Sequence, residues 1–126
     1  MKVIEDYGRA IENSDEYLFK QTFAPHVRVE IPAGAIFDEP ANAASFQLSQ
    51  VAKTAPGIKC TLTAEAGNDW HLLAFEGELK GQKLQAIDQV HLNEDGKIDH
   101  IIIYMRPIPV AQTFALAISQ RLQPAR

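Results

Sequence analysis

The sequence has a single cysteine, no basic cluster and no long apolar run. Cys60 has no second cysteine to pair with, which excludes a disulfide framework and a cysteine metal site. Asp and Glu (16) outnumber Lys and Arg (12), giving a net charge of −4, whereas a nucleic-acid-binding surface is normally basic. No apolar run approaches the roughly 20 residues of a membrane helix. The opening segment MKVIEDYGRAIENSDEY carries acids where a signal peptide is apolar. We therefore expect a cytoplasmic protein without nucleic-acid or membrane partners.

The composition is that of an ordinary globular chain. Hydrophobic residues make up 46% and charged residues 22%. A chain of 126 residues is long enough for one hydrophobic core, so we expect a single domain over residues 1–126. The four histidines are scattered and show no HxxxH-type spacing, so we expect no metal site and no cofactor.

Four segments place apolar residues at helical spacing and are bounded by Pro, Gly or Asn-Ser-Asp signals. The predicted helices cover residues 2–13, 15–23, 41–54 and 109–122. Five segments instead alternate with a period of two, which is typical of strands. The predicted strands cover residues 26–31, 58–66, 70–79, 83–93 and 97–106. Short spacers containing Gly between the last strands predict antiparallel hairpins.

The order of these elements predicts an α+β fold with a curled, mainly antiparallel sheet and helices packed on one of its faces. Residues 32–40, which end in the acidic Asp38-Glu39-Pro40, are predicted as a loop leading into the third helix.

One residue breaks the alternation of a predicted strand. In LQAIDQVHL, residues 84–92, every second residue is apolar except Asp88, which falls on the apolar face. Burial disfavours a charged carboxylate, so Asp88 is expected to have a raised pKa or a partner. A neutral Asp88 would donate a hydrogen bond to a ligand, and an ionised one would act as a general base. Alternatively, Asp88 is a structural carboxylate bonded to a neighbouring hydroxyl or backbone amide.

The order of elements and the final hairpin, LNEDGKIDHIIIYMRP, resemble the SnoaL-like members of the nuclear transport factor 2-like superfamily. The resemblance implies a cone-shaped fold with three helices in the N-terminal half, a C-terminal helix and a pocket between sheet and helices. This superfamily includes isomerases, cyclases, epoxide hydrolases, dehydratases and non-catalytic binders, so the fold alone does not select a function.

Resemblance to the ketosteroid isomerases of this superfamily assigns roles to three positions. DYGRAIENSD puts Tyr7 at the tyrosine of the oxyanion hole, and AIDQVHL puts Asp88 at its protonated acid. The base would fall in VRVEIPA on the residue before the proline, which is Ile31. Glu30 is adjacent, but strand alternation turns it to the other face. The donor pair is present and the usual base is missing. Without the resemblance, Tyr7 is an ordinary tyrosine of a helix core.

His71 is the candidate to replace that base. It shares the predicted inward face of its strand with Leu73 and Phe75, and its ordinary pKa near 6.5 suits proton transfer. The alternative is a hydrogen-bonded residue at the rim of the sheet. The residues expected to line a ligand pocket are Ile31, Leu73, Phe75, Ile101, Ile103 and Met105. Such residues would also simply fill a core.

The opposite face of the sheet is also partly apolar. Ile87, His100, Ile102 and Tyr104 fall on it, and we expect a homodimer formed through this outer face. Three functions remain open. The first is a cofactor-independent isomerase, cyclase or dehydratase acting on a small apolar molecule with a carbonyl or hydroxyl. The second is a non-catalytic binder of such a molecule, and the third is a dimeric scaffold.

Overall fold

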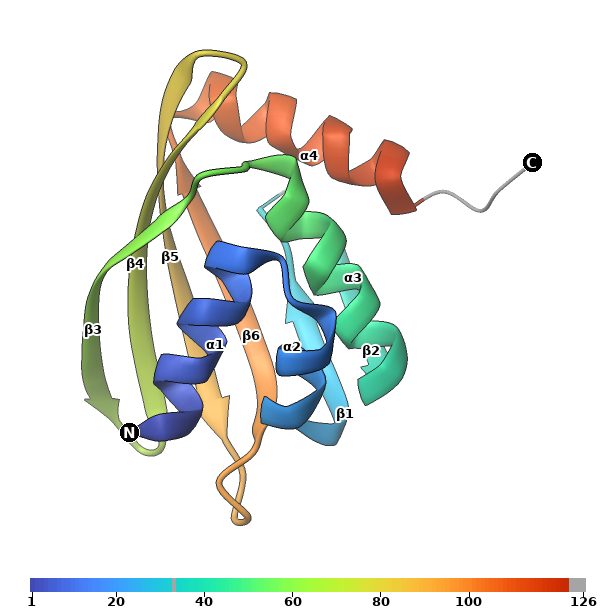
Figure 1. Ribbon diagram of the computed structural model, residues 1–126, viewed down its shortest axis with the longest axis vertical. Helices are drawn as coiled ribbons and strands as arrows, with labels where there is room; N and C mark the ends of the chain where they lie inside the picture. The colour runs from blue at the N-terminus through green and yellow to red at the C-terminus, as the bar shows by residue number, and fades with distance from the viewer. Residues whose placement is uncertain (33, 123–126) are drawn as a thin grey trace.

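A computed structural model describes residues 1–32 and 34–122 of the chain (Figure 1). Its elements are, in order, α1 (Lys2–Asn13), α2 (Glu16–Thr22), β1 (Phe23–Glu30), β2 (Ile36–Pro40), α3 (Ala41–Thr54), β3 (Lys59–Gly67), β4 (Trp70–Leu79), β5 (Gln82–Leu92), β6 (Ile98–Arg106) and α4 (Ile108–Leu122). None of the helices in these described ranges has both the length and the hydrophobicity to cross a membrane.

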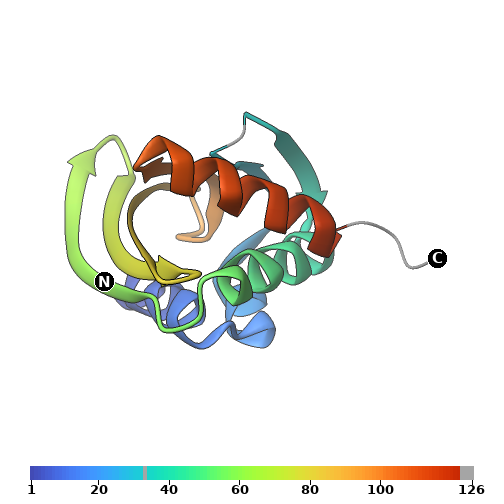
Figure 2. The ribbon, with the colours of Figure 1, turned by 90° about the horizontal axis from the view of Figure 1, so that it is seen from above.

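The six strands form one sheet in the order β2-β1-β6-β5-β4-β3. The pairing is antiparallel throughout except between β1 and β6, which run parallel. Helices α1, α2 and α3 lie on one side of the curled sheet, and α4 lies at its upper end in Figure 1. The view from above shows α4 crossing this end of the molecule (Figure 2). The predicted α+β fold with a curled, mainly antiparallel sheet is confirmed.

The inner face of the sheet packs against the helices and forms the hydrophobic core. In β1 the side chains of Val27 and Val29 are buried, whereas Arg28 between them is exposed, as the period of two predicts. The apolar side of α1 includes Ile4 and Ile11, both buried against the sheet and the other helices. The alternation in this strand thus predicted correctly which of its side chains face the core.

The loop predicted for residues 32–40 is wrong in its second half. Ile36–Pro40 form β2, an edge strand paired with β1 so that Phe37 lies opposite Val29. Residue 33, which also falls in this predicted loop, lies outside the described residues. Strand β2 is short, largely exposed and rich in residue types that strands disfavour, so its sequence has no strand signal. Its pairing with β1 depends on tertiary structure.

The boundary between the second helix and the first strand also differs from the prediction. Helix α2 ends at Thr22 and β1 begins at Phe23, so the Ala24-Pro25 pair predicted to close the helix lies inside the strand. Asp15 caps the start of α2 by accepting a hydrogen bond from the Leu18 backbone N–H at 3.0 Å. The start of this helix therefore matches the predicted signal, and its end does not.

Candidate functional site

Tyr7 lies on the inner side of α1 and is fully buried. Its ring packs edge-on against Phe19 of α2, with ring centroids 5.7 Å apart. A buried phenol needs a hydrogen-bond partner, because an unpaired hydroxyl in an apolar interior is costly. Packing against α2 fixes the ring, and the hydroxyl then points at the sheet.

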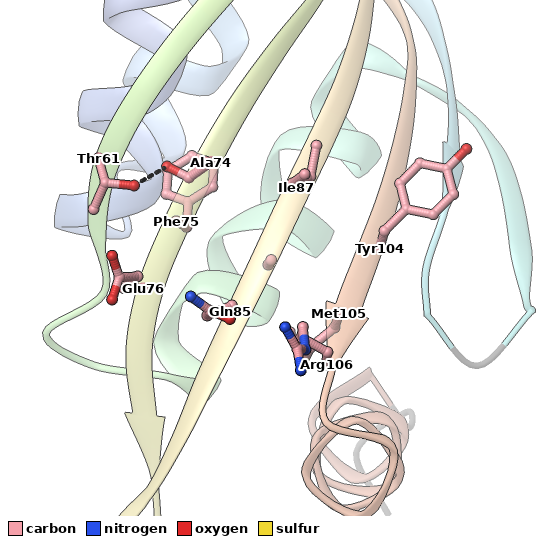
Figure 3. A pocket seen from close by; sticks show the side chains of 10 residues that line it. Thr61, Ala74, Phe75, Glu76, Gln85, Ile87, Tyr104, Met105 and Arg106 are labelled. Carbon is pink, nitrogen blue, oxygen red and sulfur yellow. Dashed lines mark hydrogen bonds between the residues drawn. The ribbon is translucent and has the colours of Figure 1, made fainter.

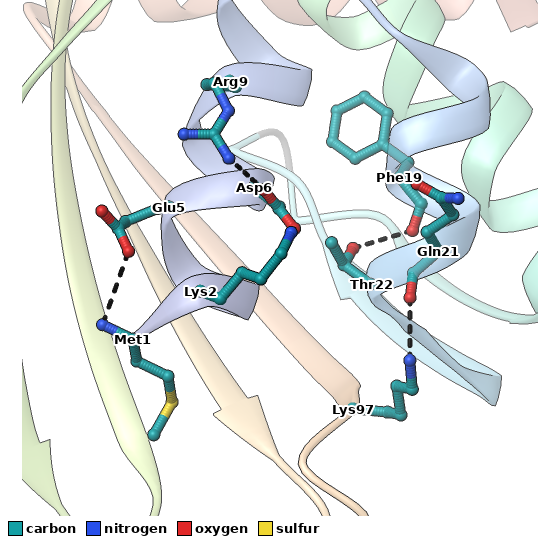
Figure 4. Close-up of polar contacts among 9 residues, drawn as sticks. All are labelled: Met1, Lys2, Glu5, Asp6, Arg9, Phe19, Gln21, Thr22 and Lys97. Atoms are coloured by element: carbon teal, nitrogen blue, oxygen red, sulfur yellow. Dashed lines mark hydrogen bonds and ion pairs between the residues drawn. The ribbon is translucent and has the colours of Figure 1, made fainter.

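The residue before Tyr7, Asp6, belongs to a polar cluster on α1 (Figure 4). Asp6 accepts a hydrogen bond from Lys2 Nζ at 2.6 Å and a second from Arg9. The hydrogen bond from Lys2 is the main cause that lowers the pKa of Asp6. The adjacent residues Asp6 and Tyr7 therefore have different environments. Asp6 pairs with cationic side chains, whereas Tyr7 points into the core.

Asp88 projects from the inner face of β5 and is 3% exposed. Its backbone neighbours across the sheet are Leu73 of β4 and Ile103 of β6. Apolar side chains therefore flank the carboxyl on both sides, and water is largely kept from it. The predicted break in the apolar alternation is confirmed as a buried carboxyl group.

The Tyr7 hydroxyl donates a hydrogen bond to Asp88 Oδ2 at 2.7 Å, joining residues 81 positions apart in the sequence. Burial raises the pKa of Asp88 from 3.8 to about 7, although the hydrogen bond from Tyr7 lowers it. Burial also raises the pKa of Tyr7 well above 10, and the negative charge of Asp88 adds to this effect. Near pH 7 the pair therefore holds a tyrosine that stays protonated and a carboxyl group that both binds and releases a proton.

The carboxyl group faces a small cavity between the sheet and the helices. Its volume is about 20 Å³, which is enough for a single water molecule. The lining residues are Ile11, Val51, Ala52, Ala55, Ile58, Phe75, Ala86, Asp88, Ile103, Met105 and Phe114. Asp88 is the one titratable side chain in this described lining. In this conformation the cone is almost filled by side chains.

Half of the predicted apolar lining borders this cavity. Phe75, Ile103 and Met105 line it, whereas Leu73 and Ile101 are fully buried beside it. The remaining lining residues come from α1, α3, α4, β5 and the segment before β3. Apolar spacing in the predicted helices indicates that they have a buried side, but a core residue and a cavity residue have the same signature in sequence.

Neither the residue at the expected position of the base, Ile31, nor the candidate replacement, His71, lines the cavity. Ile31 is buried but does not line the cavity, and the neighbouring Glu30 faces the outer side, where its Oε2 lies 2.7 Å from His100 Nε2. His71 is buried on the inner face of β4, as its position in the alternation predicts. It pairs across the sheet with Val90, one inward position beyond Asp88, and it is not part of the cavity lining.

A larger depression lies on the outer face of the sheet (Figure 3). Its volume is about 380 Å³, and it contains neither Tyr7 nor Asp88. The side chains around it are Thr61, Ala74, Phe75, Glu76, Gln85, Ala86, Ile87, Tyr104, Met105 and Arg106. Ile87 and Tyr104 are 44% and 52% exposed there, so the predicted apolar patch on the outer face is present.

No side-chain cluster resembles a metal site in the described part of the chain. Within residues 1–32 and 34–122, no three His, Cys, Asp or Glu side chains come together as ligands would. Two histidines of the outer face pair with carboxylates, His91 Nδ1 with Asp99 Oδ1 and His100 Nε2 with Glu30 Oε2, each at 2.7 Å.

Comparison with known proteins gives a match in structure but not in sequence. No family model matches the chain, and no curated protein does. An uncharacterised protein with a cystatin-like fold from Silicibacter pomeroyi DSS-3 superposes with a TM-score of 0.88 and 20% identity, covering 94% of this chain and 84% of that one. A steroid delta-isomerase from Pseudomonas aeruginosa superposes with a TM-score of 0.84 and 20% identity, covering 96% and 89% of the two chains.

A putative polyketide cyclase from Sinorhizobium meliloti is also similar, with a TM-score of 0.66, 20% identity and coverage of 82% of this chain and 94% of that one. The chain therefore has the cystatin-like fold of the nuclear transport factor 2-like proteins, as the resemblance of its sequence implied. At this level of identity the likeness concerns the fold, and the Tyr7–Asp88 pair has to be argued from its own geometry.

Proposed function

We propose that this protein binds a small, largely apolar molecule carrying a carbonyl or hydroxyl group and moves a proton on it without a cofactor. Asp88 is the acid and base of this proposal, and Tyr7 is the hydrogen-bond donor. The reaction would be of the isomerase, cyclase or dehydratase type. The similar folds of a steroid delta-isomerase and a putative polyketide cyclase support this class of substrate. A cytoplasmic location is part of the proposal.

The observation that carries the proposal is the 2.7 Å hydrogen bond between Tyr7 and Asp88 at the wall of an apolar cavity. A buried carboxyl group destabilises a fold unless it is paired, so its presence on an inward strand position calls for a reason. Its pKa of about 7 suits proton transfer near neutral pH, because both protonation states are then populated. Perturbed carboxyl groups in apolar pockets are enriched at functional sites.

The absence of a carboxylate at Ile31 shapes the proposed chemistry. With no second titratable side chain in the described cavity lining, Asp88 itself must take the proton. Its carboxylate would remove a proton from the carbon next to the carbonyl, and the electron pair would move to the carbonyl oxygen as an enolate. Once Asp88 has taken the proton, the Tyr7 hydroxyl, which donates to Asp88 Oδ2 in this structure, would turn and donate its hydrogen bond to that oxygen instead. Return of the proton from Asp88 to another carbon completes an isomerisation. The role of His71 as a reserve base stays a prediction.

Turnover of a simple probe tests this proposal. The probe is 3-cyclohexen-1-one, whose isomerisation to the conjugated 2-cyclohexen-1-one is followed by ultraviolet absorption. We expect turnover to fall about 100-fold or more in Asp88→Asn, because proton transfer by a positioned side chain contributes about that much. Asp6→Asn is the matched control, because Asp6 is also buried but pairs with Lys2 and Arg9 and does not line the cavity. Equal rates in wild type and Asp88→Asn contradict a catalytic role.

Ile31 favours a second candidate function, in which the same pair binds a ligand without converting it. Mass spectrometry of small molecules that co-purify with the protein tests binding by itself. Retention of a ligand by the wild type, and its loss in Asp88→Asn and Tyr7→Phe, supports binding at the pair. If the bound ligand then exchanges no carbon-bound hydrogen for deuterium in D₂O, the protein is a binder and not an enzyme.

We also propose that the partner of this chain is a second copy, bound through the outer face of the sheet. Ile87 and Tyr104, on the paired strands β5 and β6, and Leu62, on edge strand β3, are each more than two-fifths exposed. Water contact with such a group of apolar side chains is unfavourable, and apolar patches of this kind typically mark interfaces. Sedimentation of the purified chain, which gives its mass in solution, tests the dimer directly.

A further inference from the structure

A surface groove runs between α4 and the sheet, at the end of the molecule where α4 crosses it (Figure 2). Its volume is about 610 Å³, far larger than the 20 Å³ cavity at Asp88. Pro32 and strand β6 form one wall, and Ile108, Ala111 and Ala115 of α4 form the other. A groove of this volume falls in the range that binds small organic molecules.

The groove and the Asp88 cavity share a wall. Ile103 and Met105 line both of them, because both side chains come from the inward positions of β6 next to α4. Ile103 also pairs with Asp88 across the sheet. Met105 is partly exposed, and an unbranched thioether side chain changes conformation readily. Met105 is therefore the more adaptable side chain in the wall that the two spaces share.

The lining of the groove selects an apolar occupant. Its described residues include no formally charged side chain, and its polar groups are Gln112 and the Tyr104 hydroxyl, which already donates to Gln89 at 3.0 Å. Ile108 at its edge is 72% exposed, which is costly for an isoleucine in water unless something covers it. The cavity next to it has the opposite character, with one proton-exchanging group in a space for one water molecule.

We propose that the groove holds the apolar body of the molecule whose carbonyl or hydroxyl end reaches Asp88, with Met105 as the gate between groove and cavity. The ligand class is then an elongated, mainly hydrocarbon molecule with its polar group at one end. This inference rests on the proposed function, since it takes the Tyr7–Asp88 pair as the anchor of the polar end. It adds the binding site of the remainder of the molecule and the path by which it enters.

Two probes that differ only in an apolar tail test this inference. The first is 2-naphthol, whose oxygen can bind Tyr7 and Asp88, and the second is 6-hexyl-2-naphthol. Titration calorimetry with wild-type protein is expected to give at least about tenfold tighter binding of the hexyl probe, because burial of even part of the tail supplies that much. Ala115→Trp, which fills the groove, is expected to reduce this ratio to about one.

Leu116→Trp is the matched control, because it places the same side chain on the adjacent, 63% exposed position of α4 outside the groove lining. It should keep the wild-type ratio. Gln112→Trp, at an exposed position of the same groove, repeats the test if Ala115→Trp does not fold. A ratio near one in the wild type, or a full ratio in both groove variants, overturns the groove as a binding site.

The failure of the proposed function is separable from the failure of this inference. If 2-naphthol binds and Asp88→Asn or Tyr7→Phe weakens its binding, the anchor stands and the ratio alone decides the groove. If neither probe binds the wild type, the anchor and the groove are both contradicted. If the hexyl probe binds with the same affinity in Asp88→Asn, Tyr7→Phe and wild type, the occupant does not reach the pair and the inference is wrong.

Discussion

Each face of β5 has one residue of the type expected on the other face. On the inner face, Asp88 is a carboxyl group among buried apolar side chains. On the outer face, the adjacent Ile87 is an apolar side chain, 44% exposed, among polar residues such as Gln85. Burial of a carboxyl group and exposure of an isoleucine are both unfavourable, although the hydrogen bond from Tyr7 offsets part of the first cost. The proposed ligand would account for the first exception, and the proposed second copy of the chain for the second.

The comparison also separates what each face contributes to stability. The inner face includes Phe75, which is 2% exposed and packs in the core, whereas the outer face of the neighbouring strand leaves Ile87 accessible. If this division is correct, substitutions on the inner face change the free energy of unfolding. Substitutions on the outer face change association instead.

The largest expected effect is that of Phe75→Ala. Removal of this buried ring leaves a cavity, and we expect the free energy of unfolding to fall by about 3–5 kcal/mol. Ile87→Ala, on the outer face, is expected to cost less than about 1 kcal/mol under conditions in which the chain is monomeric. Chemical denaturation of both variants measures the difference. Similar losses in the two variants would contradict the assignment of the faces.

The next effect concerns the pH dependence of stability. The pKa of Asp88 is about 7 in the folded chain and near 3.8 when it is unfolded, so between these values the folded state holds the extra proton. Its contribution to stability is complete below pH 4 and is lost as the pH rises to 7, by at most about 4 kcal/mol. Asp88→Asn removes this loss, since an amide does not ionise.

Asp88→Asn should therefore match the wild type near pH 4 and exceed its stability at pH 8. Denaturation of both proteins at a series of pH values measures the difference between them, and this difference cancels the titration of all the other carboxylates. Two stability profiles that run parallel from pH 4 to pH 8 would show that Asp88 does not hold a raised pKa.

A smaller effect is expected from removal of the hydroxyl of Tyr7. Tyr7→Phe leaves the buried Asp88 carboxyl without its hydrogen bond, and we expect a loss of about 1–3 kcal/mol in the free energy of unfolding. Tyr104→Phe is the control on the outer face, where the exposed hydroxyl donates to Gln89, and its cost should stay within about 0.5 kcal/mol. Equal costs in thermal denaturation would mean that the inner pair has no special importance.

The smallest expected effect on folding, with the clearest effect on assembly, is that of Ile87→Asp. A carboxylate in the proposed interface is expected to weaken the dimer at least about tenfold while the monomer keeps its fold. Leu116→Asp, on exposed α4 away from the sheet, should leave the dimer unchanged. Sedimentation velocity over a range of concentrations reports both. A wild-type chain that stays monomeric at all concentrations would rule out this partner.

Much of the fold could be predicted from the sequence, because period-two alternation fixes the side of the sheet on which each side chain lies. The alternation alone was enough to predict that Asp88 and Val29 face inward. Strand β2 could not be found in this way, since Asp38, Glu39 and Pro40 are poor strand formers that pair only because β1 presents an edge to them. Local sequence signals do not record such tertiary pairing.

The residues of the candidate site could be predicted from the sequence, but the volume of its cavity could not. The break in the apolar alternation at Asp88 is visible in the sequence. Resemblance to a known family predicted that Tyr7, 81 positions away, belongs to the same site. The volume left at the carboxyl group depends on how closely Phe114 of α4 and Val51 of α3 approach it, which hydrophobic spacing does not reveal. The small cavity and the adjoining groove therefore emerge only from the structure.

The most direct measurement of the central claim is the titration of Asp88 itself. Protein labelled with ¹³C in the side-chain carboxyl of aspartate allows its ionisation to be followed by nuclear magnetic resonance, with Asp88→Asn identifying the signal. We predict a midpoint of about 7, and a higher midpoint in Tyr7→Phe, because the hydrogen bond from Tyr7 lowers the pKa of Asp88. A midpoint near 4 in the wild type would show an ordinary carboxylate and contradict a proton-exchanging site.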